Sequence, residues 1–383
     1  MNPVPVAWLS LPELRRRHSY KWRAYPPDIL PAFVAEMDIQ LAPPVAGALA
    51  TAIADGDTGY AARDPELAQA AAAFQAARFG WGPDQAGVTF IPDVMAGVAE
   101  VLRRAVPPGS GVVINTPIYP PFFNHIREVG CQVVEAPLAR DGAGYSLDLD
   151  VVEAAFAAGA RAYLLCNPHN PTGLVLGPDE LRRVAELSER FDVLVLADEI
   201  HGPLTLPGAR HVPYLSLPEA RDRGVTFVSA SKAWNIPGLK CAHTMTASTP
   251  MRALISRLPD DIAFRAGNLG LIASRAAYEV GAPWLDQVLD LIDGNRRLMA
   301  RLLAERIPEI GYVAPRGTYL AWLDCTRLEL AVEPAEVFRK RGRVALGRGS
   351  AFGLQSRDFV RVTLATDPAI LTEIVGRMRA ALD

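Results

Sequence analysis

Short apolar runs alternate with amphipathic stretches along the middle of the chain, from about residue 64 to residue 230. The run Val193–Ala197 is apolar at every position, which is typical of a parallel strand covered by helices on both faces. In the stretch Pro178–Arg190, Leu181, Val184 and Ala185 share one helical face. This alternation predicts an α/β fold with a mainly parallel sheet. The expected strands are 112–115, 132–136, 162–166, 193–197 and 226–228, and the expected helices include 66–79.

The pattern changes after about residue 275, where two long amphipathic stretches are followed by short strands near 319–323 and 359–363. We interpret this part as a smaller α+β domain. The first 35 or so residues are rich in proline and predict an irregular arm. The expected organisation is therefore an arm that contributes to the small domain (1–45), a large ligand-binding domain (46–275) and a small C-terminal domain (276–383).

Composition narrows the class of protein. The chain has 383 residues, of which 50% are hydrophobic and 21% are charged, and these are values of a globular protein. A formal net charge of −3 argues against a broad basic surface that binds nucleic acid. No apolar run is long enough to span a membrane, and the first ten residues lack the order of a secretory signal. The four cysteines have neither metal-ligand spacing nor the density of a disulfide scaffold, so we expect a cytoplasmic protein without a metal.

Polar clusters follow three of the predicted strands. These clusters are Asn167–Gly173, Asp198–His201 and Ser229–Lys232. Because ligands of open parallel sheets bind beyond the carboxyl ends of the strands, the three clusters predict one shared site. An amide, a carboxylate, hydroxyl groups and an amine suit a charged, planar, phosphorylated ligand, with the lysine as nucleophile. Lysines are scarce in this chain: they occur only at positions 21, 232, 240 and 340, beside 35 arginines.

Each of these residues also has a structural interpretation. Asp198 could cap a turn, Asn170 could belong to a proline-rich turn, and Lys232 could be a solvated surface residue. His201 could be a hydrogen-bonded structural histidine. The functional interpretation depends on the occurrence of all three clusters at equivalent strand ends.

The same motifs resemble those of the fold-type-I pyridoxal 5′-phosphate (PLP) enzymes, the aspartate aminotransferase superfamily. Within it, the chain is similar to the cystathionine β-lyase and cysteine-S-conjugate β-lyase group of the class-II aminotransferase type, from about residue 18 to the C-terminus. The resemblance implies a three-layer αβα large domain with PLP as cofactor. The segments that carry the subgroup resemblance are Ala35–Asp38, Asp198–His201, Asn235–Leu239, Gly281–Asp286 and Thr318–Leu323.

Carried over residue by residue, the resemblance implies that Lys232 binds the cofactor as a Schiff base and that Asp198 pairs with its pyridine nitrogen. Asn170 and His201 would lie at the ring O3′, and Tyr119 would stack on the ring, although Tyr119 could also be a loop aromatic packed beside prolines. An anion at the pyridine nitrogen keeps that nitrogen protonated, and the ring can then absorb the electrons of a Cα carbanion.

For the cofactor phosphate, the resemblance implies Ser229, the backbone N–H groups of Val94 and Met95 at a helix start, and Lys240 in a position where the superfamily often has arginine. Asp93 departs from the family pattern, because a carboxylate beside a phosphate is repelled. We therefore expect Asp93 to point away or to cap the helix.

Two further residues complete the implied site. Tyr60 matches the tyrosine that reaches the phosphate of a neighbouring subunit, which implies a homodimer with shared sites. Arg361 matches the arginine that binds the substrate α-carboxylate by two hydrogen bonds, although without the family it would be interpreted as a surface ion pair.

The implied reaction is β-elimination from cystathionine or a cysteine S-conjugate, in which Lys232 removes the Cα proton and a thiol, pyruvate and ammonia are released. Transamination between an amino acid and a 2-oxo acid uses the same residues and stays open as the alternative. A regulator that keeps the fold as a PLP sensor is a third possibility, for which no separate DNA-binding module is visible.

Overall fold

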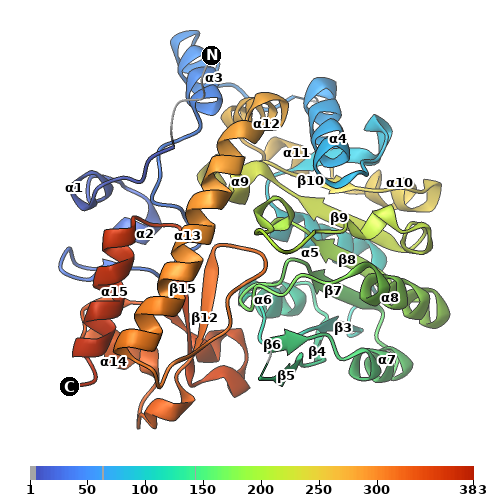
Figure 1. The fold of residues 1–383 in the computed structure, drawn as a ribbon. Coiled ribbons are helices and arrows are strands. Elements are labelled where there is room, and N and C mark those ends of the chain that lie inside the picture. The colour runs from blue at the N-terminus through green and yellow to red at the C-terminus, as the bar shows by residue number, and fades with distance from the viewer. Residues whose placement is uncertain (1–5, 63, 143) are drawn as a thin grey trace.

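The computed structural model describes residues 6–62, 64–142 and 144–383, and a seven-stranded sheet lies at the centre of its larger part (Figure 1). The strand order is β2-β10-β9-β8-β7-β3-β4, in which only β10 runs antiparallel to its neighbours. The five strands predicted from the apolar runs are confirmed, whereas the short β2 and β10 were missed. The strands are β2 (Val88–Ile91), β3 (Gly111–Ile114), β4 (Gln132–Glu135), β7 (Ala162–Cys166), β8 (Leu194–Asp198), β9 (Gly224–Val228) and β10 (Ala242–Met245).

Helices cover both faces of this sheet, because successive strand residues point to opposite sides. Val112 and Ile114 pack into one apolar core with α5, α6 and α10, whereas Val113 faces the other core, which contains α4, α7, α8 and α12. The predicted three-layer α/β fold is therefore confirmed. The helices of these layers are α3 (Pro43–Ala54), α4 (Pro65–Phe79), α5 (Val94–Ala105), α6 (Pro121–Glu128), α7 (Leu149–Ala157), α8 (Pro178–Phe191), α9 (Ala230–Ala233), α10 (Thr249–Ile255), α11 (Asp261–Phe264) and α12 (Asn268–Val280). A separate two-stranded antiparallel sheet consists of β5 (Ala139–Asp141) and β6 (Gly144–Ser146).

A second, antiparallel sheet of order β11-β12-β15-β14 forms the smaller part of the molecule, with α13 and α15 side by side against it (Figure 1). The two strands expected near 319–323 and 359–363 are confirmed as β12 and β15. The expectation of two long amphipathic stretches after about residue 275 is wrong: the described residues between there and β12 contain one long helix, α13, because α12 begins at Asn268 and packs in the core of the larger part. These elements are α13 (Ala282–Arg306), β11 (Gly311–Tyr312), β12 (Leu320–Asp324), α14 (Pro334–Lys340), β14 (Gly347–Arg348), β15 (Phe359–Thr363) and α15 (Pro368–Ala380).

The N-terminal segment packs on this smaller part and is more regular than the expected arm. It contains the short helices α1 (Leu11–Leu14) and α2 (Tyr20–Arg23), and its strand β1 (Leu30–Pro31) pairs in parallel with β13 (Val344–Ala345). Leu14 and Trp22 lie in the same apolar core as α13 and α15. The domain boundaries at residues 45 and 275 stay predictions.

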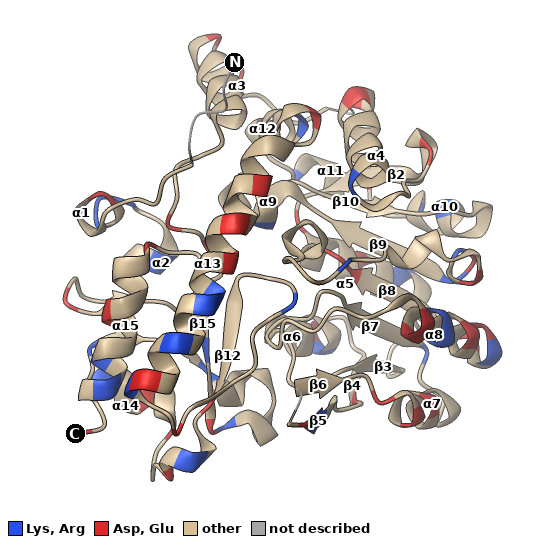
Figure 2. Cartoon of the chain, in the orientation of Figure 1, with Lys and Arg blue, Asp and Glu red and all other residues tan. Residues whose placement is uncertain are grey.

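Charged side chains of both signs are spread over the helices, and α13 carries them in an ordered way (Figure 2). Its three aspartates lie in the first half of the helix, and its four arginines lie in the second half. In the last turn, Arg306 lies where a positive charge is favoured by the helix dipole. Within the described residues, no helix is both long and apolar enough to cross a membrane.

Candidate active site

The three polar clusters meet, because β7, β8 and β9 are adjacent parallel strands. Their carboxyl ends form the floor of a cavity of about 810 Å³, and Arg361 on β15 and residues 33–35 of the N-terminal segment close it from the other side. The volume is in the range of small-molecule sites. Of the residues predicted from the sequence, all but Ser229 and Tyr60 line it: Val94, Met95, Tyr119, Asn170, Asp198, His201, Lys232, Lys240 and Arg361.

The cavity shifts the pKa values of Asp198 and Lys232 from opposite sides toward neutral pH. Burial, together with the neighbouring Glu199, raises the pKa of Asp198 to about 7, although the backbone N–H of Ile200 donates to its Oδ1 at 3.1 Å. Burial and the positive charge of Arg361 lower the pKa of Lys232 to about 8. Because burial makes the ionised form of Asp198 costly, a cationic partner stabilises it, and an amine with the pKa of Lys232 is partly neutral at physiological pH.

The Lys232 side chain reaches across the cavity to the N-terminal segment. Its Nζ donates to the carbonyl oxygen of Ala35 at 3.0 Å, and the hydroxyl group of Tyr319 donates to the same oxygen at 2.9 Å. Ala35 lies in a motif that contributed to the family resemblance, but the sequence assigned it no role. Its contribution comes from a backbone carbonyl, which no residue type can signal.

Arg361 is buried and lies over the Phe352 ring at 5.0 Å. Its Nη1 donates to Asn170 Oδ1 at 3.0 Å, its Nη2 donates to the Phe33 carbonyl oxygen at 2.7 Å, and its Nε has no hydrogen-bond partner among the residues that the structure describes. Burial lowers the pKa of Arg361 to about 10. A buried guanidinium that is bound only by neutral groups is a strong site for a carboxylate, because it lacks a counter-charge.

The expectation for Asp93 is confirmed, because its carboxylate caps α5. Asp93 Oδ1 accepts the backbone N–H of Ala96 at 2.8 Å, and Oδ2 forms an ion pair with Lys240 Nζ at 3.1 Å. Asp93 therefore holds Lys240 beside the N-terminus of α5. The N-terminal residues of this helix, Val94 and Met95, line the cavity, and free N–H groups at a helix start attract anions.

Ser229 caps the short helix α9 instead of lining the cavity. Its hydroxyl group donates to the carbonyl oxygen of Cys241 at 2.7 Å and accepts the N–H of Ser231 at 3.0 Å. Ser229 lies two residues before Ser231, which lines the cavity, and its predicted phosphate contact stays a prediction.

His201, which follows β8, and Tyr119, which precedes α6, both line the cavity. Burial, followed by the positive charges of Lys232 and Arg361, lowers the pKa of His201 well below its ordinary value, so this ring is neutral at pH 7. Its Nδ1 has no hydrogen-bond partner within the described part of the chain. Tyr119 precedes α6 and contacts the edge of Phe122, with 5.9 Å between the ring centroids. Both rings are available to a ligand in the cavity.

Tyr60 lies outside the cavity and is 86% exposed. Its ring contacts the exposed ring of Phe264 at a centroid distance of 6.3 Å, and its backbone bridges to Gly267. Two neighbouring exposed aromatic rings are uncommon on a free surface and suit an interface between subunits.

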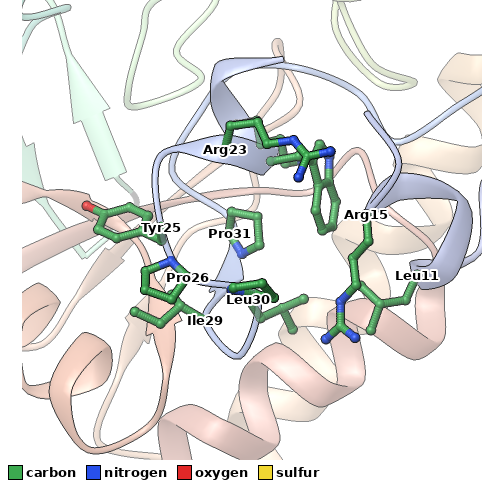
Figure 3. A pocket seen from close by; sticks show the side chains of 11 residues that line it. Leu11, Arg15, Arg23, Tyr25, Pro26, Ile29, Leu30 and Pro31 are labelled. Carbon is green, nitrogen blue, oxygen red and sulfur yellow. The ribbon is translucent and has the colours of Figure 1, made fainter. Parts of the chain in front are cut away.

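A second cavity, of about 240 Å³, is lined in part by residues 21–23 of α2 (Figure 3). Arg15, Arg23 and Tyr25 line it together with prolines of the N-terminal segment. It contains none of the residues predicted for the active site.

The chain matches the model of the family described as aminotransferase class I and II over residues 39–378. The chain belongs to the class I and II aminotransferase family. A Mycobacterium tuberculosis relative with the provisional name cystathionine beta-lyase is 44% identical over 100% of this chain and 99% of that protein. The cystathionine beta-lyase of Corynebacterium glutamicum is 34% identical over 90% of this chain and 91% of that protein.

Solved structures of the family have the same fold. A Corynebacterium diphtheriae structure, described provisionally as a PLP-dependent β-cystathionase, has a TM-score of 0.94 at 34% identity and covers 98% of this chain and 99% of that one. The family and the fold implied by the sequence motifs are therefore confirmed.

Proposed function

We propose that this chain is a PLP-dependent carbon–sulfur β-lyase that cleaves cystathionine or a cysteine S-conjugate. In the overall reaction, the conjugate R–S–CH2–CH(NH3⁺)–COO⁻ and one water give the thiol R–SH, pyruvate and an ammonium ion. The observation that carries the proposal is the placement of Lys232 in one cavity with Asp198 and the partly unpaired Arg361. The names of the curated relatives support the choice of carbon–sulfur cleavage within the family.

The residues in the cavity fit the cofactor. Asp198 is a buried acid that favours a protonated ring nitrogen, and the start of α5 together with Lys240 offers N–H groups and a positive charge to a phosphate. His201 Nδ1 is an unpaired buried atom that a ring oxygen can satisfy. When bound, PLP supplies a conjugated ring that accepts the electron pair left by a broken Cα–H bond.

The chain's own residues supply binding and proton transfer. Arg361 binds the substrate α-carboxylate, in exchange for its present bonds to Asn170 and Phe33. The amine of Lys232, with its lowered pKa, takes the Cα proton and holds it as an ammonium group. Loss of the Cα proton makes the β-thiolate a leaving group.

An assay of products tests the proposal. Incubation of the loaded enzyme with S-benzylcysteine, a simple S-conjugate, is expected to yield thiol and pyruvate in equal amounts. A 2-oxo acid that keeps its sulfur, formed with the aminated cofactor, would instead assign the chain to transamination. Transamination is the alternative because the matched family is described as aminotransferase class I and II.

The role of Lys232 has its own test. Borohydride reduction of the loaded parent protein, followed by peptide mass analysis, is expected to find the cofactor on Lys232. Lys232→Ala should lose both this adduct and the visible absorption band after dialysis, whereas Lys340→Ala, a change at an exposed lysine, should keep both.

We also propose that the active unit is a homodimer in which Tyr60 reaches the partner's phosphate site. The exposure of Tyr60 beside Phe264 supports this assembly. Mixing inactive Tyr60→Phe and Lys232→Ala proteins should restore part of the activity, because one of the mixed sites then carries neither change. No recovery after subunit exchange would contradict a shared site.

The proposed location of the protein is the cytoplasm, where the free, buried cysteines stay reduced.

A further inference from the structure

An unusual number of polar side chains hold the backbone of residues 33–39, which we call the bridging segment. Arg361 donates to the carbonyl oxygen of Phe33, Lys232 and Tyr319 donate to that of Ala35, and Asn235 exchanges two hydrogen bonds with the backbone of Met37. Arg17 donates to the carbonyl oxygens of Met37 and Ile39. The bridging segment therefore connects the active-site lysine to the N-terminal segment.

A fully buried ion pair also connects the bridging segment to helix α2. Lys21 Nζ lies 2.7 Å from Asp38 Oδ2, and the two side chains are 0% and 1% exposed. The same ammonium group donates to the carbonyl oxygen of Glu36 at 3.1 Å, and Trp22 Nε1 donates to Asp38 Oδ1 at 3.0 Å. Lys21 thus holds the bridging segment at two points that lie one and three residues after Ala35.

Stability alone is a poor reason for such a pair. Two charges without water lose their hydration, and replacement by apolar side chains of similar size is often neutral or stabilising. What a buried pair with further hydrogen bonds supplies is a fixed geometry. The atom whose position this geometry controls is the Ala35 carbonyl oxygen, the acceptor of the Lys232 amine.

We propose that Lys21 and Asp38 are positioning residues for the active-site amine. Their ion pair, acting through the backbone of residues 35–38, holds the Ala35 carbonyl oxygen where it receives the amine of Lys232 whenever that amine is free. The inference rests on the role proposed above for Lys232. In that role the substrate displaces the Lys232 amine, which is then free. After this amine has taken the Cα proton, the resulting ammonium group donates a hydrogen bond to the Ala35 carbonyl oxygen.

The proposal predicts a change in the affinity of Lys232 for protons. A hydrogen bond to a carbonyl oxygen stabilises the ammonium form, so a displaced carbonyl lowers the pKa of the amine. The variant is Lys21→Met combined with Asp38→Asn, which removes both charges, leaves no lone buried ion and keeps an acceptor for Trp22. Because the lost charges are opposite, the net charge near Lys232 is unchanged.

The charged and titratable groups around Lys232 on the other elements are unchanged in this variant. They are Arg361 on β15, Asp198 at the end of β8 and His201 after it, Lys240 beside α5, Tyr319 on the shared carbonyl, and Asp93, Tyr119, His125 and Cys166 in the cavity wall. Glu36, whose charge raises the pKa of Lys232, belongs to the bridging segment and moves with it. A shift of the Lys232 titration therefore reports the position of the bridging segment, through the Ala35 carbonyl oxygen and the Glu36 carboxylate that it carries.

The measurement is competitive acetylation of the cofactor-free protein as a function of pH, with peptide mass analysis. With only four lysines in the chain, every site can be followed, and the exposed Lys340 serves as the internal reference. In the double variant, the midpoint for Lys232 is expected to fall by about one pH unit, which is the order expected for loss of one charge-assisted hydrogen bond. The midpoint for Lys340 should not move.

Two further variants complete this test: one is used if the double variant does not fold, and the other is a control. Trp22→Phe removes only one hydrogen bond to Asp38 and keeps the core filled, so it should give a smaller shift in the same direction even if the double variant fails to fold. Arg23→Ala lies on the same helix, lines the second cavity and should give no shift (Figure 3). An unchanged Lys232 midpoint in the folded variants, or an equal shift in Arg23→Ala, would overturn the proposal.

Failure of this inference is distinguishable from failure of the proposed function. The product assay and the borohydride adduct are measured on the parent protein and do not depend on Lys21 or Asp38. A parent that releases thiol and pyruvate, together with an unmoved Lys232 titration in the variants, would reject the positioning role alone.

Discussion

The buried carboxyl group of Asp198 should make the cofactor-free protein less stable as the pH rises. The pKa of this group is about 7 in the folded protein, against an ordinary value of 3.8. Between these two values the folded state keeps a proton that the unfolded state has released, so stability is fully present at low pH and is lost on the way to about pH 7. The difference corresponds to a total loss of about 4 kcal/mol.

Asp198→Asn removes this loss, because an amide does not titrate. Relative to the parent, the variant should gain about 2 to 3 kcal/mol of unfolding free energy between about pH 5 and about pH 8. The assay is urea unfolding of both cofactor-free proteins at several pH values in this range, with the difference between them as the readout. Lys232 is common to both proteins, so most of its own pH dependence cancels.

The loaded proteins provide the complementary measurement. The proposed ring nitrogen would give Asp198 a cationic partner, so the same substitution should weaken cofactor retention and reduce turnover by orders of magnitude. Parallel stability curves for parent and variant across this pH range would refute the assignment of a costly buried charge at Asp198.

Three other substitutions, two of them with a control variant, test the active site and the packing of the helices around it. Arg361→Lys should lower kcat/KM about tenfold to a hundredfold, mainly through KM, because one two-pronged contact to the α-carboxylate is lost, and an unchanged KM would contradict this role. Gly270→Ala places a Cβ 2.2 Å from the carbonyl oxygen of Leu239 and should cost about 1 to 3 kcal/mol in chemical denaturation. The control is Gly294→Ala, where the space is open and a gain of about 0.5 to 1 kcal/mol is expected. Asp93→Ala should cost about 1 kcal/mol through the lost cap of α5, and Asp93→Asn should cost clearly less; equal costs would show that the cap contributes little.

Periodicity predicted the parallel strands of the large sheet and the antiparallel strands β12 and β15, but it missed β2 and β10 of the large sheet. A central parallel strand such as β8 is buried on both faces and therefore reads as a continuous apolar run. The strand β10 is buried as well, but it contains His243 and Thr244, whose polar groups lie in the interior. Its apolar signal is therefore interrupted, and only its pairing with β2 and β9 makes it a strand.

The sequence by itself determined the family, the mainly parallel sheet and the three polar clusters at strand ends, because these depend on local patterns and on motifs with fixed spacing. Only the tertiary structure decided which groups touch. It brought Arg361 and the bridging segment from opposite ends of the chain to Asn170 and Lys232, and it paired Lys21 with Asp38. The physical reason is that backbone carbonyls and the burial of charges have no signature in residue type: they arise when distant segments pack and exclude water.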